Sequence, residues 1–406
     1  MNINRIGLLL ISAVVFGASL TSFAGAAEVE TINPGGTPWT AHTWGYSTPK
    51  LLFDGKNEYA VGLIGTGPGH DFARLFMRDS LGWHKGADIA PVYQPTTIVL
   101  DRKGRINLFC TEAGKQGFNW RSKRPGDVSD FEQIPLPKPE KFSFGYLGAG
   151  VDRNVMALVG LDSGYNMWIT CQQSPSSVWT EPIMLVKSIR ELPRISPVYP
   201  IVMPRDKQVY VVYSNSPDGS IHNTYNRVEY LIYDIPTARV VKHEIITDGP
   251  IGEYTFGLDA YLAPDGTLYV LHFGGIRVYR KKRADIGSRR GLFCTVIREG
   301  SPMQTSKVTD STGTAQLSPV KGRTPEIFQT TSTGTECYRS SDGGSKWKAA
   351  ALPAWTGTSS FLYALKPNSG SARDEKQRFV QSTKISTEQG YSFEYIELQR
   401  NTRGTR

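Results

Sequence analysis

Histidine and arginine side chains follow one another closely in two loops of the sequence. His70 is followed by Arg74 and Arg78, and His222 is followed by Arg227. An imidazole can take up or release a proton near neutral pH, and a guanidinium can neutralise a carboxylate. Together these groups suit acid–base chemistry on an anionic substrate.

Removal of a proton beside a sugar carboxylate needs a cation, a base and an acid. Arg78 or Arg227 would neutralise the carboxylate. His222 or His70 would take the proton, and Tyr199 would supply one to the leaving oxygen. Loop histidines also commonly make only local hydrogen bonds, so these roles are hypotheses.

Aromatic residues at the start of apolar strands add a surface on which sugars could stack. The expected substrate-binding set, besides Arg78, is Trp44, Tyr93, Gln94, Tyr146, Tyr254, Asp259 and His272. Aromatic rings at such positions can also simply fill a channel. Glu253 and Asp259 form a further candidate, an acid and base pair of a glycoside hydrolase.

The elements that must position these residues are short apolar strands joined by tight turns. One hairpin, in which an apolar strand meets a turn with aspartate and a second apolar strand follows, recurs five times. Its turns contain Asp54, Asp101, Asp152, Asp206 and Asp265. The spacing of roughly 50 residues is typical of the blades of a β-propeller.

Two weaker units, at 319–347 and from residue 360 onward, raise the count to seven. We therefore predict an all-β, seven-bladed propeller, with six blades as an alternative count and a sandwich or β-helix as alternative folds. In a propeller the connections into the inner strands and the turns between second and third strands open on one face. The candidate residues would gather there, around a central funnel.

The first 26 residues have the layout of a cleavable signal peptide. Arg5 precedes an apolar run over 6–20, and Ala24 and Ala26 supply the small residues of a cleavage site. A membrane anchor is the alternative, but the run is shorter than the roughly 20 residues that cross a bilayer. We expect residues 27–406 to form one secreted or periplasmic propeller domain without a membrane anchor.

The net charge of +9 favours an anionic partner. Export argues against nucleic acid, and the dispersed cations argue against a membrane surface. The one cluster, over 277–290, is interpreted as a solvated strand pair, with a binding patch as the alternative. An acidic polysaccharide or oligosaccharide, bound by a monomer, is the expected partner.

The four cysteines are Cys110, Cys171, Cys294 and Cys337. Two disulfides with three possible pairings, or four buried thiols in strands, both fit their positions. Their spacing does not match a zinc site, so no metal is predicted, and the sequence leaves the cofactor open.

One segment has the spacing of an Asp-box, Ser-x-Asp-x-Gly-x-x-Trp, formed by Ser340, Asp342, Gly344 and Trp347. Asp342 would accept turn amides, the glycines would take positive φ angles, and Trp347 would pack under the hairpin. With the blade pattern, this segment resembles the sialidase-like superfamily of BNR-repeat propellers. A Phe-Arg-Ile-Pro motif, expected of a true sialidase, is absent.

Within that superfamily the order of segments is similar to the branch of ulvan-type polysaccharide lyases and related rhamnosidases. Three segments carry the similarity: YQPTTIVLDRKGRINLF, the pair Tyr199-Pro200, and DAYLAPDGTLYVL. The resemblance implies a catalytic role for Tyr199. The family pattern has histidine where this chain has Tyr93-Gln94-Pro95, and arginine where it has Ser214-Asn215.

These observations predict a carbohydrate-active propeller that acts on a uronate-containing polysaccharide by lyase or glycoside hydrolase chemistry. A non-catalytic glycan-binding propeller is the main alternative. A sialidase and a protein-interaction scaffold are the others, because a fold does not determine a function.

Overall fold

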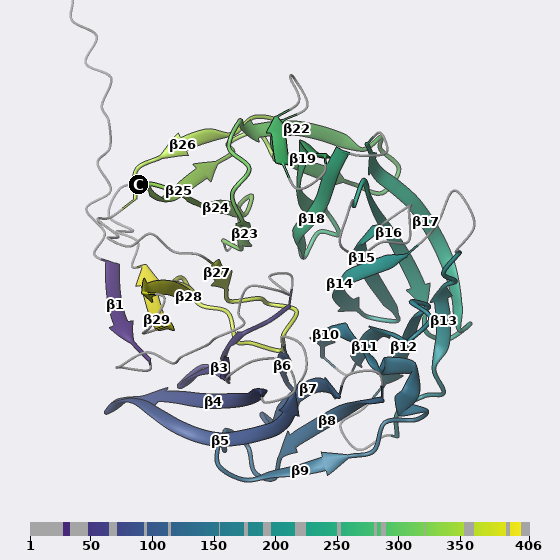
Figure 1. Ribbon diagram of the computed structural model, residues 1–406, viewed down its shortest axis with the longest axis vertical. Helices are drawn as coiled ribbons and strands as arrows, with labels where there is room; N and C mark the ends of the chain where they lie inside the picture. The colour runs from purple at the N-terminus through teal and green to yellow at the C-terminus, as the bar shows by residue number, and fades with distance from the viewer. Residues whose placement is uncertain are drawn as a thin grey trace, which may run out of the picture.

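Seven antiparallel sheets stand around a ring in the computed structural model of the chain (Figure 1). The structure describes residues 27–32, 48–64, 71–92, 96–112, 115–153, 155–173, 178–189, 196–215, 225–249, 253–279, 282–285, 290–320, 322–352, 361–386 and 390–398. The predicted seven-bladed β-propeller is confirmed, and the alternatives of six blades, a sandwich or a β-helix are wrong. Over these ranges no helix is long and apolar enough to cross a membrane.

The blades follow one another along the chain, each from its inner strand outward. The first blade contains β2 (Leu51–Phe53), β3 (Glu58–Ile64), β4 (Asp71–Asp79) and β5 (Gly82–Val92). The second contains β6 (Thr97–Leu100), β7 (Ile106–Glu112), β8 (Gln116–Ser122) and β9 (Phe131–Ile134). After a short 3-10 helix, η1 (Pro139–Phe142), the third contains β10 (Phe144–Asp152), β11 (Val155–Leu161), β12 (Met167–Gln172) and β13 (Ile183–Val186).

The remaining blades repeat this order, with one addition in the fifth. The fourth contains β14 (Pro197–Arg205), β15 (Gln208–Asn215), β16 (Arg227–Asp234) and β17 (Arg239–Asp248). The fifth contains β18 (Glu253–Leu262), β19 (Leu268–Tyr279), β21 (Gly291–Ile297) and β22 (Gln304–Thr309), with β20 (Lys282–Asp285) paired to β19. The sixth contains β23 (Ala315–Ser318), β24 (Glu326–Thr331), β25 (Gly334–Arg339) and β26 (Lys348–Ala350).

The seventh blade joins the two ends of the described chain. It contains β27 (Phe361–Ala364), β28 (Gln377–Ser386) and β29 (Gly390–Leu398), and its outer strand is β1 (Ala27–Thr31). β1 pairs antiparallel with β29, with Ala27 opposite Leu398. The ring is therefore closed by backbone hydrogen bonds between distant parts of the sequence.

Apolar composition separates the inner strands from the outer ones. Every residue of β3 and β11 is buried, because both faces of these strands pack against neighbouring blades. β17, at the rim, alternates exposed and half-buried residues in the sequence RVVKHEIITD. Period-two alternation thus survives only where one face of a strand meets water.

The five aspartate turns occupy equivalent places, each between the first and second strand of its blade. In the three longer turns, the carboxylate accepts a backbone N–H two residues later. Oδ1 of Asp54, Asp101 and Asp265 accepts such bonds at 2.8, 2.8 and 2.9 Å. We call the side of the ring that carries these turns the turn face, and the opposite side the funnel face.

The turn that contains Ser340 and Asp342 lies between β25 and β26, also at the turn face. Asp342 Oδ1 accepts the N–H of Lys346 at 2.9 Å, and Ser340 Oγ accepts the N–H of Gly344 at 2.8 Å. Gly344 has φ +99°, and Trp347 is buried beneath the turn. The turn is built by these local hydrogen bonds.

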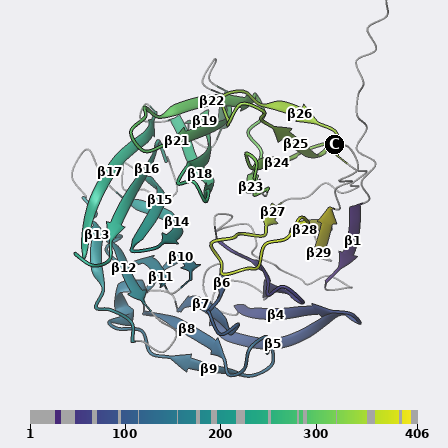
Figure 2. The same ribbon diagram turned by 180° about the vertical axis from the view of Figure 1, so that it is seen from behind.

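The connection between β27 and β28 crosses the middle of the ring, as both views show (Figures 1 and 2). We call residues 366–372 the plug. The carbonyl of Asn368 accepts the N–H of Val151 at 2.6 Å, and that of Ser369 accepts the N–H of Leu100 at 2.8 Å. The plug bonds to residues of all six other blades, which are Phe53, Leu100, Val151, Val202, Asp259 and Leu317.

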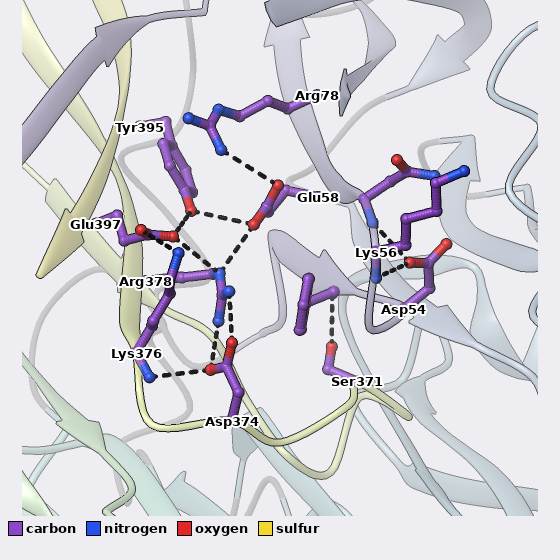
Figure 3. A network of polar contacts seen from close by, with 12 residues as sticks. Asp54, Lys56, Glu58, Arg78, Ser371, Asp374, Lys376, Arg378, Tyr395 and Glu397 are labelled. Carbon is purple, nitrogen blue, oxygen red and sulfur yellow. Dashed lines mark hydrogen bonds and ion pairs between the residues drawn. The ribbon is translucent and has the colours of Figure 1, made fainter. Parts of the chain in front are cut away.

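A charged cluster ties the seventh blade to the first at the turn face (Figure 3). Arg378, which is buried, donates from Nε to Glu58 Oε1 at 2.9 Å and also binds Asp374 at 2.6 Å. The hydroxyl of Tyr395 donates to Glu397 Oε2 at 3.1 Å. Buried carboxylates are tolerated here because each is paired with a cation or hydroxyl.

All four cysteines are buried and free, so the disulfide alternative is wrong. They lie in β7, β12, β21 and β25, each in a different blade. Burial raises the pKa of the Cys110 thiol to about 12, which keeps it protonated and unreactive at neutral pH.

Candidate functional site

Tyr146 and Tyr199 occupy the same place in neighbouring blades, near the start of the inner strands β10 and β14. At both places the pairing with the second strand shifts register. Both tyrosines have φ +54°. Such a backbone costs about 1–3 kcal/mol and persists only where surrounding structure enforces it, commonly at functional sites.

Their rings form the centre of an aromatic cluster at the funnel face. The centroids of Tyr146 and Tyr199 lie 4.2 Å apart, and that of Tyr199 lies 4.9 Å from Phe256 and 5.8 Å from Tyr225. Tyr254 extends the cluster, 5.4 Å from Tyr225. Three of the residues predicted from the sequence, Tyr146, Tyr199 and Tyr254, are thus brought together by three different blades.

The hydroxyl groups of this cluster interact with one another. Burial raises the pKa of the Tyr225 hydroxyl, nearby tyrosines raise it further, and a hydrogen bond with Tyr199 works in the opposite direction. Tyr225 therefore stays protonated at neutral pH. The pair places a phenolic proton donor among aromatic rings that are themselves buried.

Arg227 lies at the start of β16, at the funnel face, but carboxylates already surround it. Its Nη2 contacts Asp248 Oδ2 at 2.9 Å, and its Nη1 lies 3.7 Å from Glu229 Oε1. Glu229 also accepts hydrogen bonds from Tyr213 at 2.6 Å and contacts His243 at 2.7 Å. Arg227 was predicted to neutralise a substrate carboxylate. In the structure its guanidinium is instead paired with Asp248 and Glu229.

Arg78 lies at the opposite face from Tyr199, contrary to the prediction. It sits near the end of β4, beside the turn face, where Nε contacts Glu30 at 3.0 Å and Nη1 lies 3.6 Å from Glu58. Because β4 runs from the funnel face to the turn face, a residue near its end cannot line the funnel.

Asp259 is fully buried, so its predicted roles in substrate binding and as a hydrolase carboxylate are wrong. Its Oδ2 accepts the N–H of Leu317 at 2.6 Å and pairs with the ammonium of Lys366. The carboxylate joins inner strands and has no access to solvent.

His272 is also buried, which corrects its assignment to substrate binding. Its Nε2 contacts Thr295 Oγ1 at 3.0 Å, and its ring stacks on Phe293 with centroids 5.6 Å apart. Burial lowers the pKa of His272 to about 4, so the imidazole is neutral at neutral pH.

Five predicted site residues lie outside the described residues. They are Trp44, His70, Tyr93, Gln94 and His222. The signal peptide over 1–26 lies outside them as well. The roles of these five residues and of the signal peptide remain predictions.

Sequence reasoning missed Lys50, which directly precedes β2 at the funnel face. It is 2% exposed and its ammonium donates to the carbonyl of Thr96. Burial lowers its pKa to about 7. A lysine adjoining the apolar run LLF was the available signal.

Tyr225 and Phe256 were missed too. Tyr225 stands two residues before the third strand of the fourth blade, and Phe256 lies two residues beyond Tyr254. Over the described ranges, no group of three histidine, cysteine or acidic side chains is placed to hold a metal ion.

No family model matches the chain, and a search of curated proteins finds no match in sequence. Solved structures do match. An ulvan lyase, described as a new family of polysaccharide lyase, is 14% identical over 93% of this chain and 94% of that chain, with a TM-score of 0.61. Its structure bound to -[GlcA(1-4)Rha3S]- is 14% identical over 91% and 93%, with a TM-score of 0.62.

A protein of another kind is similar as well. The WD40 domain of coronin from Toxoplasma gondii is 9% identical over 93% of this chain and 88% of that chain, with a TM-score of 0.56. At such identities the similarities show a shared fold, and the function has to be argued from the site.

Proposed function

We propose that this chain is an exported, carbohydrate-active propeller that acts on an acidic polysaccharide at the funnel face. The observation that carries the proposal is the position of Tyr199, held at positive φ in the middle of an aromatic cluster and hydrogen-bonded to Tyr225. The half-buried ring of Tyr254 at the edge of the cluster suits contact with a sugar ring, and the phenol of Tyr199, which is 8% exposed, suits proton donation. The net charge of +9 suits an anionic substrate.

The reaction we favour is β-elimination at a uronate. A base removes the proton next to the carboxylate, the bond from the sugar to the glycosidic oxygen breaks, and a double bond forms within the ring. Tyr199 supplies the proton that the departing oxygen takes up, and His222 or His70 is the proposed base. The similarity to an ulvan lyase supports this choice. The Asp-box spacing of Ser340, Asp342, Gly344 and Trp347 is the basis for proposing a place near the sialidase-like BNR propellers.

Non-catalytic glycan binding is the second candidate. The ion pairs of Arg227 with Asp248 and Glu229 favour it, because they occupy the cation that an elimination would need to neutralise the uronate. In both cases we propose that the protein acts as a monomer outside the cytoplasm after removal of residues 1–26.

The test is incubation of the protein with a panel of uronate-containing and sulfated polysaccharides. Cleavage by elimination creates an unsaturated uronate that absorbs ultraviolet light. We expect Tyr199→Phe to lower turnover by at least about 100-fold with binding retained. Tyr59→Phe, which removes a hydroxyl bonded to Asp54 at the turn face, is the matched control.

The two candidates give different results in this assay. Binding without turnover in the parent protein supports the glycan-binding alternative. Neither cleavage nor binding of any member of the panel rejects both.

A further inference from the structure

A cavity lies on the turn face, away from the aromatic cluster. It measures about 670 Å³ and is bordered by the first turns of the fifth, sixth and seventh blades. We call it the turn cavity. Its volume falls in the range of about 300–1,000 Å³ that is usual for small-ligand sites.

Three exposed arginines line the turn cavity: Arg298, Arg323 and Arg373. None of them forms an ion pair with any residue that the structure describes. The other two cations of the lining are engaged, since Lys376 pairs with Glu397 at 2.7 Å and Arg378 pairs with Asp374 at 2.6 Å. The three arginines are therefore the cations of the cavity that remain available.

The arginines stand on anchored segments. Arg298 Nη2 donates to the carbonyl of Gly343 at 2.9 Å, and a Cβ at position 343 would lie 2.9 Å from the same nitrogen. Arg373 follows Ala372, whose N–H bonds to the carbonyl of Phe53 at 2.7 Å. Arg323 N–H bonds to the carbonyl of Val320 at 3.2 Å. The side chain of Arg298 and the backbone at Arg323 and beside Arg373 are thus held before any ligand arrives, which lowers the entropy cost of binding.

Two tyrosines complete the wall. The rings of Tyr261 and Tyr269 lie 6.3 Å apart and nearly parallel, at 19°. Burial raises the pKa of both hydroxyls, against the opposing effect of Arg373 on Tyr261 and of Arg298 on Tyr269. Both hydroxyls remain protonated at neutral pH, each close to a guanidinium.

The acidic residues in the lining do not cancel the positive charge of the three arginines. Asp374 is bound by Arg378, and Asp265 Oδ1 accepts the N–H of Thr267 at 2.9 Å. Glu375 is the remaining carboxylate of the lining, and it is exposed to solvent.

We propose that the turn cavity binds the sulfate or carboxylate group of an acidic saccharide, as a second site on the face opposite Tyr199. Planar guanidinium groups and phenolic hydroxyls present the N–H and O–H donors that such oxyanions accept. That the ligand is an anion follows from the residues of the cavity and does not depend on the proposed function. The choice of a saccharide rests on the proposed function.

The test uses the whole protein, with inorganic sulfate and a sulfated uronate oligosaccharide as probes in titration calorimetry. We expect both probes to bind, and the double variant Arg323→Gln/Arg373→Gln to weaken both at least tenfold. Arg239→Gln, which removes an exposed arginine from the rim strand β17, is the matched control and should leave this binding unchanged.

Several results would overturn the proposal: no sulfate binding, equal binding by the double variant, or binding of sulfate without the oligosaccharide. Tyr199→Phe separates the two sites. If turnover depends on Tyr199 while the double variant binds normally, the turn cavity fails and the proposed function stands. If arginine-dependent binding occurs in a protein that cleaves nothing, the site stands and the enzymatic function fails.

Discussion

The carboxylate of Asp259 and the ammonium of Lys366 meet inside the ring, although 107 residues separate them in sequence. Both groups are buried, and Lys366 also donates to the carbonyl of Leu317 at 3.2 Å. The pair therefore connects the fifth, sixth and seventh blades at the base of the plug.

Removing one partner should expose the cost of burying the other. We expect Lys366→Met to destabilise the protein by about 3–5 kcal/mol, because an unpaired carboxylate would remain in the interior. Urea denaturation measures the change. The control Lys123→Met breaks a pair with Asp130 in which the two side chains are 52% and 51% exposed, and should cost less than about 1 kcal/mol. Equal losses for both variants would contradict this account.

The plug depends on a glycine. Gly370 has φ +79°, and a Cβ there would lie 2.1 Å from the carbonyl oxygen of Leu100, so the backbone must move. We expect Gly370→Ala to lose about 1–3 kcal/mol from this clash beyond the cost of the positive φ. Gly300→Ala is the matched control, with φ +70° and no atom within 4 Å. Similar melting temperatures for the two variants would show that the clash is relieved freely.

Arg78 holds the strand that closes the ring. Its side chain contacts Glu30 at 3.0 Å and Glu28 at 3.1 Å, both on β1. We expect Arg78→Gln to raise amide hydrogen exchange in 27–31 several-fold, since an edge strand opens with a low free energy. Arg74→Gln, which removes a pair with Asp88 inside the first blade, should leave that segment protected. Unchanged exchange in Arg78→Gln would mean that the backbone pairing with β29 suffices.

Lys50 should make stability depend on pH. Its folded pKa of about 7 lies below the ordinary value of 10.5, so between these values the unfolded state binds more protons. Stability then rises with pH across this window, by up to about 1.4 kcal/mol per pH unit. Below it Lys50 is protonated in both states, so the cost of burying its charge is constant with pH. The measurement is the difference in unfolding free energy between wild type and Lys50→Met near pH 7.5 and pH 9.5. A difference that is constant with pH would show that Lys50 is charged in the folded protein.

The aspartate hairpins could be predicted because their information is local. A carboxylate that accepts an amide two residues later, as Asp54 does for Lys56, is visible in the sequence as a turn between two apolar runs. The plug could not be predicted, because residues 366–372 bond to strands up to several hundred positions away. Nothing in a short polar segment indicates which carbonyl it will meet.

In the candidate site too, positions set by strand order could be predicted and positions set by contacts between distant segments could not. That Tyr146, Tyr199 and Tyr254 lie near one another could be predicted, because strand starts gather on one face of a propeller. Arg78 was misplaced because it lies seven residues after Asp71, the first residue of β4, and an extended strand covers about 23 Å over that length, enough to reach the opposite face of the ring. Asp259 was misassigned because its carboxylate pairs with Lys366, which reaches it from the seventh blade.

The plug also limits how a polymer could meet this protein. Since residues 366–372 block the channel at the turn face, a long glycan cannot be threaded through the ring. Any glycan that reaches Tyr199 must lie across the funnel face and must also leave from that face. Bonds in the middle of a polysaccharide are then as accessible as those at its ends. This geometry suits an enzyme or a binding protein that acts at internal positions of the polymer.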